Sequence, residues 1–310
     1  MPQQPKSIDM EPKFSIVITT KDRLLDLQNT LVIIAPFIAR EDTECIICDD
    51  GSKDGTAAYI NYNFPQIQLL RHLKSKGLIC SRNYLFTMAR GIYVISLDDD
   101  AHFLSKDALR TAETYFKENE KCGLIAFRIY WGKKQLEFYD HFDSPHRVQG
   151  YVGCGHIWNM KAWQEIPNYP EWFVFYGEEL FAAFHLFKKG WEIHYVPDIL
   201  IQHRVDVKAR KKDLDYYIRM RYSLRSGWYI YLLFYPWRKI PKKFAYTLWR
   251  QLKLKVFKGD LRAGWALMRA LADVIYNLPR ILRNSNRLTA EEFKEFSKLA
   301  QTKMYWKPER

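Results

Sequence analysis

One stretch decides the fold of this chain: Gly91-Ile92-Tyr93-Val94-Ile95-Ser96-Leu97-Asp98-Asp99-Asp100. It is an apolar, β-branched run, typical of a buried strand, and it ends abruptly in three carboxylates. Neighbouring anions disfavour one another's ionised form, a cost that a bound Mg²⁺ or Mn²⁺ removes because these ions prefer oxygen ligands. Ligands of open α/β sheets also bind at the carboxyl ends of strands. An isolated Asp-Asp-Asp is more often a solvated turn, so the site depends on what surrounds it.

Apolar runs alternate with helical segments on both sides of this stretch. We predict strands at 14–20, 44–48, 67–71 and 92–97, and helices at 23–38, from about Asp54, and at 78–89. Strands that alternate with helices of this length form βαβ units and a parallel sheet. A second acidic pair, Asp49-Asp50, follows the strand at 44–48. Both acidic clusters should therefore lie at one edge of one sheet.

The next hundred residues read as a second half of the same domain. We expect a helix from Ser105, as its N-cap, to about Glu118, and a helix at 178–188 that ends at Gly190. Strands are expected at 123–131 and 191–196, with an irregular, aromatic stretch from Gly150 between them. The sequence thus predicts an α/β fold for residues 1–204 and a helical region for residues 205–310.

Composition limits the class of protein. The chain has 310 residues, of which 48% are hydrophobic and 27% charged, so we expect a globular protein of one large or two fused domains. Its first 13 residues lack the apolar core of a signal peptide, which favours a cytoplasmic location. The five cysteines are scattered, and Cys45 and Cys48 lie in an apolar run. We therefore expect buried thiols rather than disulfides or a metal pair.

The positive charge is concentrated in the C-terminal third. Residues 204–287 carry 21 lysines and arginines but 5 aspartates and glutamates, which gives this region a net charge of +16. The whole chain has a net charge of +13, so the rest of the chain is slightly acidic. Two aromatic segments lie there, at 228–235 and 246–258, and the second contains Trp249 and Phe257. Neither is long enough to span a bilayer. They suit helices that lie on an anionic membrane surface, or a helical subdomain packed on the catalytic core.

The motifs of the first half, taken in order, resemble the family 2 glycosyltransferases of the GT-A fold. The resemblance rests on the strand and turn at 14–23, the Asp-Asp-Gly-Ser element at 49–52, the segment from Gly77 through Ser81-Arg82-Asn83 to Gly91, and the Asp-x-Asp site at 98–100. It implies a Rossmann-like, mostly parallel sheet with flanking helices, a nucleotide-sugar half at about 13–101 and an acceptor half at about 102–204. The nucleotide-binding residues that it implies are Thr19, Thr20, Asp22, Arg23, Asp50, Gly77, Arg82, Asp98 and Asp99.

The resemblance also covers the acceptor half, with departures. Tyr176-Gly177-Glu178-Glu179-Leu180 resembles the Gly-Glu-Asp motif, whose second carboxylate serves as the base, so the role maps to Glu179 with Glu178 as the alternative. Asp98, Asp100 and the terminal His203 are the implied ligands of Mn²⁺ or Mg²⁺. A buried histidine held by hydrogen bonds is an equally good interpretation of His203.

What the resemblance implies is an inverting, metal-dependent transfer of a sugar from a nucleotide-diphosphate sugar, with UDP favoured. The acceptor would be a hydroxyl of a glycan or a lipid-linked molecule, and the enzyme would lie at the inner face of the membrane. The oligomeric state is left open. Two alternatives stay open as well: a nucleotidyltransferase on a similar fold, although no glycine-rich loop follows the first strand, and a nucleic-acid-binding protein that uses the basic tail. The acidic clusters argue against nucleic acid as a partner.

Overall fold

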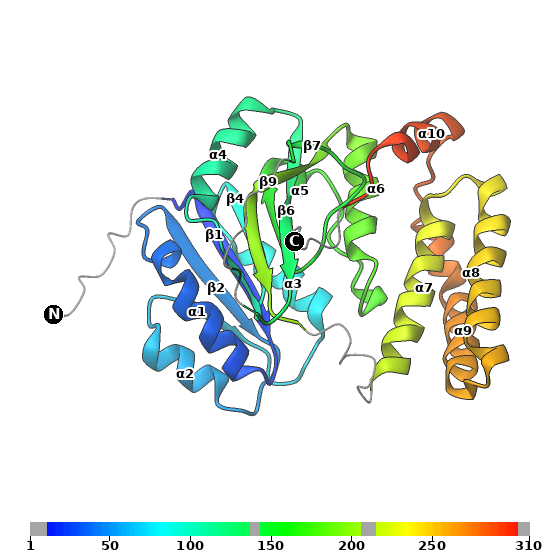
Figure 1. Cartoon of the computed structure of the whole chain (residues 1–310), viewed down its shortest axis with the longest axis horizontal. Coiled ribbons are helices and arrows are strands. Elements are labelled where there is room, and N and C mark those ends of the chain that lie inside the picture. The colour runs from blue at the N-terminus through cyan, green and yellow to red at the C-terminus, as the bar shows by residue number, and fades with distance from the viewer. Residues whose placement is uncertain (1–10, 135, 137–142, 206–214, 303–310) are drawn as a thin grey trace.

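An α/β domain carries a group of C-terminal helices in the computed structural model, which describes residues 11–134, 136, 143–205 and 215–302 (Figure 1). The first half consists of β1 (Phe14–Thr20), α1 (Leu24–Ile38), β2 (Thr43–Asp49), α2 (Thr56–Asn63), β3 (Gln68–Arg71), α3 (Leu78–Met88) and β4 (Tyr93–Asp98). The second half consists of β5 (Ala101–Phe103), α4 (Ala108–Glu118), β6 (Cys122–Trp131), β7 (His146–Arg147), β8 (Gly155–Asn159), α5 (Met160–Gln164), α6 (Glu178–Lys189) and β9 (Glu192–His203). The C-terminal helices are α7 (Tyr216–Phe234), α8 (Ile240–Leu254), α9 (Leu261–Arg283) and α10 (Ala290–Lys298).

The strands form one mixed sheet in the order β3-β2-β1-β4-β8-β6-β9-β5, and β7 also pairs with β9. β3, β2, β1 and β4 are parallel, as predicted from the alternating pattern. β8 runs antiparallel between β4 and β6, whereas β6 and β9 are parallel. The predicted α/β fold with a C-terminal helical extension is confirmed.

Both faces of the sheet are covered, which explains why the central strands are apolar throughout. In β1, Ile16 and Ile18 pack with Leu27 and Leu31 of α1. Val17 points to the other face, into a core that contains residues of α3. The thiols of Cys45 and Cys48 are buried as well, one in each core, and no disulfide joins any of the five cysteines.

The predicted N-cap at Ser105 is wrong. α4 begins at Ala108, and the Oγ of Ser105 instead donates to the carbonyl of Asp198 and accepts from the amide of Leu200, which ties the segment to β9. α2 begins at Thr56, near Asp54 as predicted. The Asp54 carboxylate accepts from the Leu24 amide, 2.8 Å away, and so joins the second acidic turn to the start of α1.

The segment at 228–235, expected to lie on a membrane or to pack as a subdomain, is packed. Trp228 of α7 is 1% exposed, and Phe234 stacks on Phe184 of α6 with ring centroids 4.9 Å apart. Helix α9 packs along α7. The interpretation of this segment as an interfacial helix is therefore wrong, because α6 and α9 cover it. None of the helices within the described ranges is both long and apolar enough to cross a bilayer.

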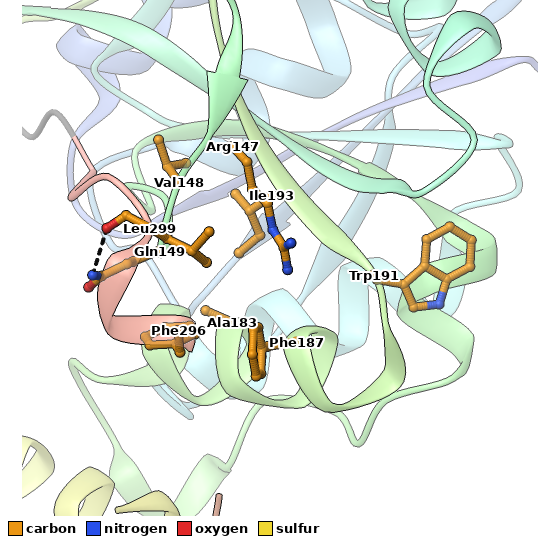
Figure 2. Close-up of a pocket in the computed structure, with 9 residues that line it drawn as sticks. All are labelled: Arg147, Val148, Gln149, Ala183, Phe187, Trp191, Ile193, Phe296 and Leu299. Carbon is orange, nitrogen blue, oxygen red and sulfur yellow. Dashed lines mark hydrogen bonds between the residues drawn. The ribbon is translucent and has the colours of Figure 1, made fainter. Parts of the chain in front are cut away.

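Helix α10 brings the chain back to the α/β domain. Its Phe296 packs on Phe184 and Phe187 of α6, and Ala300 then forms a β-bridge with Val148. Between α10, α6 and β9 a shallow hollow is left, lined by Arg147, Val148, Gln149, Ala183, Phe187, Trp191, Ile193, Phe296 and Leu299 (Figure 2). This hollow shares no residue with the acidic clusters.

Candidate active site

The strand register brings the two acidic clusters together. Thr19 of β1 lies beside Asp98 of β4, and Thr20 lies beside Asp49 of β2. Thr20 Oγ1 donates to Asp99 Oδ2 at 2.9 Å. The predicted meeting of both clusters at one edge of the sheet is thus confirmed.

Asp22 holds the β1 turn against the β2 turn. Its amide donates to Ser52 Oγ at 2.9 Å, and its Oδ1 accepts from the Lys53 amide at 2.7 Å. Its φ of 51° is left-handed, a conformation that aspartate tolerates better than most residues. In this structure the carboxylate of Asp22 therefore shapes the loop.

Asp50 is also engaged with the protein. Its carboxylate accepts from Ser75 Oγ at 2.6 Å and from the amides of Lys76 and Gly77 at 2.7 and 3.0 Å. Burial alone would raise the pKa of Asp50, but these three hydrogen bonds outweigh burial and lower it. Gly77 has a φ of 92°, so the turn that brings these amides onto Asp50 favours glycine at this position.

Asp98, Asp100 and His203 converge from β4, its following turn and the end of β9. One ligand atom from each lies within 4.8 Å of the others. Asp100 Oδ1 and His203 Nε2 are buried and lie 3.0 Å from each other, and neither atom has a hydrogen-bond partner elsewhere among the described residues. Oxygen and imidazole donors left unpaired in this way fit a divalent cation such as Mn²⁺ or Mg²⁺.

Arg23 faces the same carboxylates from the start of α1. Its guanidinium lies 2.7 Å from Asp100 Oδ2 and 3.0 Å from Asp99 Oδ1. Asp99 is buried, and burial raises its pKa to about 7 although the charge of Arg23 opposes the shift. Arg23 thus places a partly exposed cation beside the acidic cluster, where a diphosphate would need one.

Arg82 of α3 joins the donor and acceptor motifs. Its guanidinium donates to Asp98 Oδ1 at 2.8 Å, to Glu178 Oε1 at 3.0 Å and to the carbonyl of Gly153 at 2.8 Å. Both Arg82 and Glu178 are buried, each 3% exposed. A buried charge needs such partners, so this pair fixes the start of α6 beside β4.

The two glutamates at the start of α6 differ in their surroundings. Glu178 is held by Arg82, whereas Glu179 is partly exposed. The Oε1 of Glu179 lies so close to Gly153 that a Cβ at that position would be only 2.8 Å away, so a larger residue would displace this carboxylate. Burial raises the pKa of both carboxyls, although the charge of Arg82 opposes the shift. A carboxyl with a raised pKa is suited to accept a proton near neutral pH. Glu179 therefore has the exposure that a base needs.

A scan against family models agrees with this geometry: residues 15–187 match the model of glycosyl transferase family 2. The chain belongs to this family. Family membership supports the predicted GT-A-like fold and argues against the nucleotidyltransferase and nucleic-acid-binding alternatives.

Two curated relatives match parts of this glycosyltransferase. One is the uncharacterized glycosyltransferase YfnE of Bacillus subtilis (strain 168), 28% identical over 140 residues, which are 44% of this chain and 35% of the relative. The other is UDP-Glc:alpha-D-GlcNAc-diphosphoundecaprenol beta-1,3-glucosyltransferase WfaP of Escherichia coli, 28% identical over 109 residues, which are 35% of this chain and 42% of the relative. The chain thus spans less than half the length of both relatives.

Solved structures show the same fold at low sequence identity. S. aureus TarS 1-349 in complex with UDP-GlcNAc has a TM-score of 0.58 and 16% identity, over 88% of this chain and 84% of that one. Mannosyltransferase PcManGT from Pyrobaculum calidifontis in complex with GDP-Man and Mn2+ has a TM-score of 0.53 and 13% identity, over 94% of this chain and 80% of that one.

Three residues shape the candidate site although the sequence analysis did not assign them to it. Ser75 holds Asp50, Gly153 receives Arg82, and Arg225 of α7 donates to the carbonyl of Phe173 just before the acceptor helix. Gly153 lies in the Gly-Cys-Gly run at 153–155, which was a visible signal. The hydrogen bond from Arg225 to Phe173 depends on how α7 packs, and no local sequence pattern predicts it.

Proposed function

We propose that this glycosyltransferase moves a sugar, with inversion, from a UDP-sugar to a hydroxyl of a lipid-linked or glycan acceptor in a metal-dependent reaction. The observation that carries the proposal is the convergence of buried, unpartnered ligand atoms from Asp100 and His203 beside Asp98. The acceptor helix α6 begins next to them and is joined to Asp98 through Arg82.

The metal ligands in this proposal are Asp98, Asp100 and His203. When bound, Mn²⁺ or Mg²⁺ neutralises negative charge on the diphosphate of the donor. Arg23 reaches the same region and contributes a second cation as the leaving diphosphate gains charge. Of the three ligands, Asp98 has the most exposed side chain, 28% against 1% for Asp100, so it faces the incoming donor.

The nucleotide would lie at the carboxyl ends of β1, β2 and β4, where Thr19, Thr20, Asp22, Asp50, Gly77 and Asp99 meet. The carboxylates of Asp22 and Asp50 already accept hydrogen bonds from backbone amides. We therefore propose that they mainly shape the pocket, and that they contact the nucleotide directly only where a carboxylate oxygen can accept a second hydrogen bond. UDP is favoured by the names of WfaP and of the TarS complex, whereas PcManGT was solved with GDP-Man. The donor panel below therefore includes both nucleotides.

Glu179 is the proposed base. It accepts the proton of the acceptor hydroxyl while that oxygen attacks the anomeric carbon from the face opposite the leaving diphosphate. Glu178 is the alternative, which we favour less because its Oε1 is bound to Arg82 and its side chain is buried. A single displacement of this kind inverts the anomeric configuration.

A lipid-linked acceptor is supported by the name of WfaP, which acts on a diphosphoundecaprenol-linked sugar. Such an acceptor would place this enzyme at a membrane surface, at the cytoplasmic side where nucleotide sugars are made available. The basic C-terminal region, with its balance of +16 over residues 204–287, fits that placement.

The test is a thermal-shift panel of UDP-, GDP- and dTDP-sugars with and without Mn²⁺, because a ligand that binds the folded state alone raises its melting temperature. We expect a UDP-sugar to give the largest shift, and only with metal. Asp100→Ala should lose the shift. The control is Glu41→Ala, an exposed acid just before β2 and so at the opposite end of that strand from Asp49, which should keep it. A metal-dependent shift that persists in Asp100→Ala would refute the metal assignment.

A further inference from the structure

Helix α9 has two apolar faces, and only one is covered. The face against α7 is formed by small and aliphatic residues, among them Ala263, Ala270 and Val274, all buried. On the opposite side, exposed apolar residues recur every three to seven positions: Leu261, Trp265, Met268, Ile275 and Leu282. At a rise of about 1.5 Å per residue this stripe is about 32 Å long.

Two further exposed rings lie shortly before α9 in the chain. Phe257 is 67% exposed, and its ring lies 6.0 Å from that of Trp249 near the end of α8. Exposed large apolar side chains that form a continuous patch on a soluble domain mark an interaction surface. We name this set, Trp249, Phe257 and the five stripe residues of α9, the outer patch.

The charges around the outer patch are of one sign. Residues 240–283 contain ten lysines and arginines and two aspartates. Both aspartates are used internally: Asp260 accepts from the Ala263 amide at 2.9 Å, and Asp273 binds Arg221 of α7 at 2.7 Å. Arg262 and Arg269 are exposed beside the stripe. The surface therefore combines exposed apolar side chains with cations, while its two aspartates bind other groups of the protein.

We propose that the outer patch is a membrane-docking surface, which lies flat in the interfacial region of an anionic lipid bilayer. Tryptophan and tyrosine favour this region, and lipid phosphates attract each basic residue by about 1 kcal/mol. A second copy of the chain fits less well, because pairing two stripes about a two-fold axis would bring Arg262 and Arg269 of both copies together. The proposal deepens the proposed function by naming the surface that would carry the enzyme to a lipid-linked acceptor.

Docking through α9 would also fix the active site relative to the bilayer. Arg225 and Ser226 of α7 bind the carbonyls of Phe173 and Phe175, next to the acceptor helix. Because α7 also packs on α9, it connects the helix of the outer patch to the acceptor side. A membrane-bound α9 would therefore hold α6 at a set distance from the lipid.

The experiment is co-sedimentation of the full chain with vesicles of phosphatidylcholine alone or mixed with phosphatidylglycerol, in about 0.1 M and about 1 M NaCl, where the Debye length falls from about 10 Å to about 3 Å. No donor or acceptor is needed, so failure here is distinct from failure of the proposed function. We expect binding to the anionic vesicles that weakens in high salt but persists.

The variants separate the apolar and charged contributions. Trp265→Ser with Met268→Ser should lower the salt-resistant binding by about tenfold or more, whereas Arg262→Gln with Arg269→Gln should mainly lower binding in low salt. The matched control is Tyr62→Ser with Val32→Ser, two exposed apolar residues on α2 and α1, which should bind like the wild type.

Three results would overturn the proposal. The first is a wild type that anionic vesicles do not retain, and the second is a Trp265/Met268 variant that binds as tightly as the control. In the third, analytical ultracentrifugation without lipid shows a concentration-dependent dimer that the same variant abolishes, and the patch is then an interface between copies.

Discussion

Replacing Arg82 by methionine would remove the cation that Glu178 and Asp98 share. Methionine keeps an unbranched side chain of related shape, so the main loss is charge. Removing one partner of a buried ion pair costs about 3–5 kcal/mol, because the other charge is left without compensation. Both side chains of the Arg82–Glu178 pair are buried, at 4% and 3% exposure. We therefore expect a loss of about 3 kcal/mol at a pH above the folded pKa of Glu178, about 8, where the wild-type carboxylate is charged.

The loss should depend on pH in a defined direction. Burial raises the pKa of Glu178 above its unfolded value of about 4.3, and the charge of Arg82 opposes that rise, so removing Arg82 raises this pKa further. The folded variant then binds more protons than the unfolded chain above about pH 4.3. Both proteins therefore lose stability as the pH rises above about 4.3, by up to about 1.4 kcal/mol per pH unit. In the wild type this loss stops near the folded pKa of Glu178, about 8, whereas in the variant it continues to a higher pH, so the difference between them opens above about pH 8.

The assay is urea unfolding of Arg82→Met, Glu178→Gln, the double variant and Arg82→Lys, followed by circular dichroism from about pH 6 to about pH 10. Arg82→Met should approach the wild type at the acid end and lose stability toward the alkaline end. The double variant should recover much of the loss, because no unpaired charge remains at position 178. A pH-independent loss, or a double variant no more stable than Arg82→Met, would show that the pair does not hold α6 in place.

Two further predictions concern the base and the packing of β1 on β4. Glu179→Gln should lower turnover by about 10² or more while the metal-dependent thermal shift of the donor is kept, and an active Glu179→Gln beside an inactive Glu178→Gln would reverse the assignment. Gly91→Ala should destabilise the fold by about 1–3 kcal/mol, because its Cβ would lie 2.6 Å from the backbone nitrogen of Ser15. Thermal melts should show no such loss for Gly227→Ala, a helical glycine whose Cβ would have no neighbour within 4 Å.

The donor half could be predicted closely from the sequence because its signals are local. The run at 14–20 coincides with β1, and the apolar run before Asp98 forms β4 within one residue of its expected bounds. Once the strands are parallel, the meeting of the acidic clusters follows from topology alone. The acidic residues at 98 and 100 and His203 were brought together as expected.

What could not be predicted depends on contacts between distant segments. Asp50 accepts from residues 75–77, and Ser105 bonds to β9 instead of capping α4. The run at 228–235 shows the same limit, since its composition suits a membrane surface equally well. Its burial is decided by α6 and α9, and the apolar stripe of α9 stands out only once the other face of that helix is seen to be covered.

The return of α10 to the α/β domain has a consequence for synthesis on the ribosome. Phe184 and Phe187 of α6 are covered by Phe296, and Val148 pairs with Ala300, so the acceptor half is completed by residues made more than a hundred positions later. The four parallel strands of the donor half, by contrast, are all made by Asp98. The nascent chain can thus form its nucleotide half early, while the apolar surface of α6 must be shielded until residue 300 has left the exit tunnel.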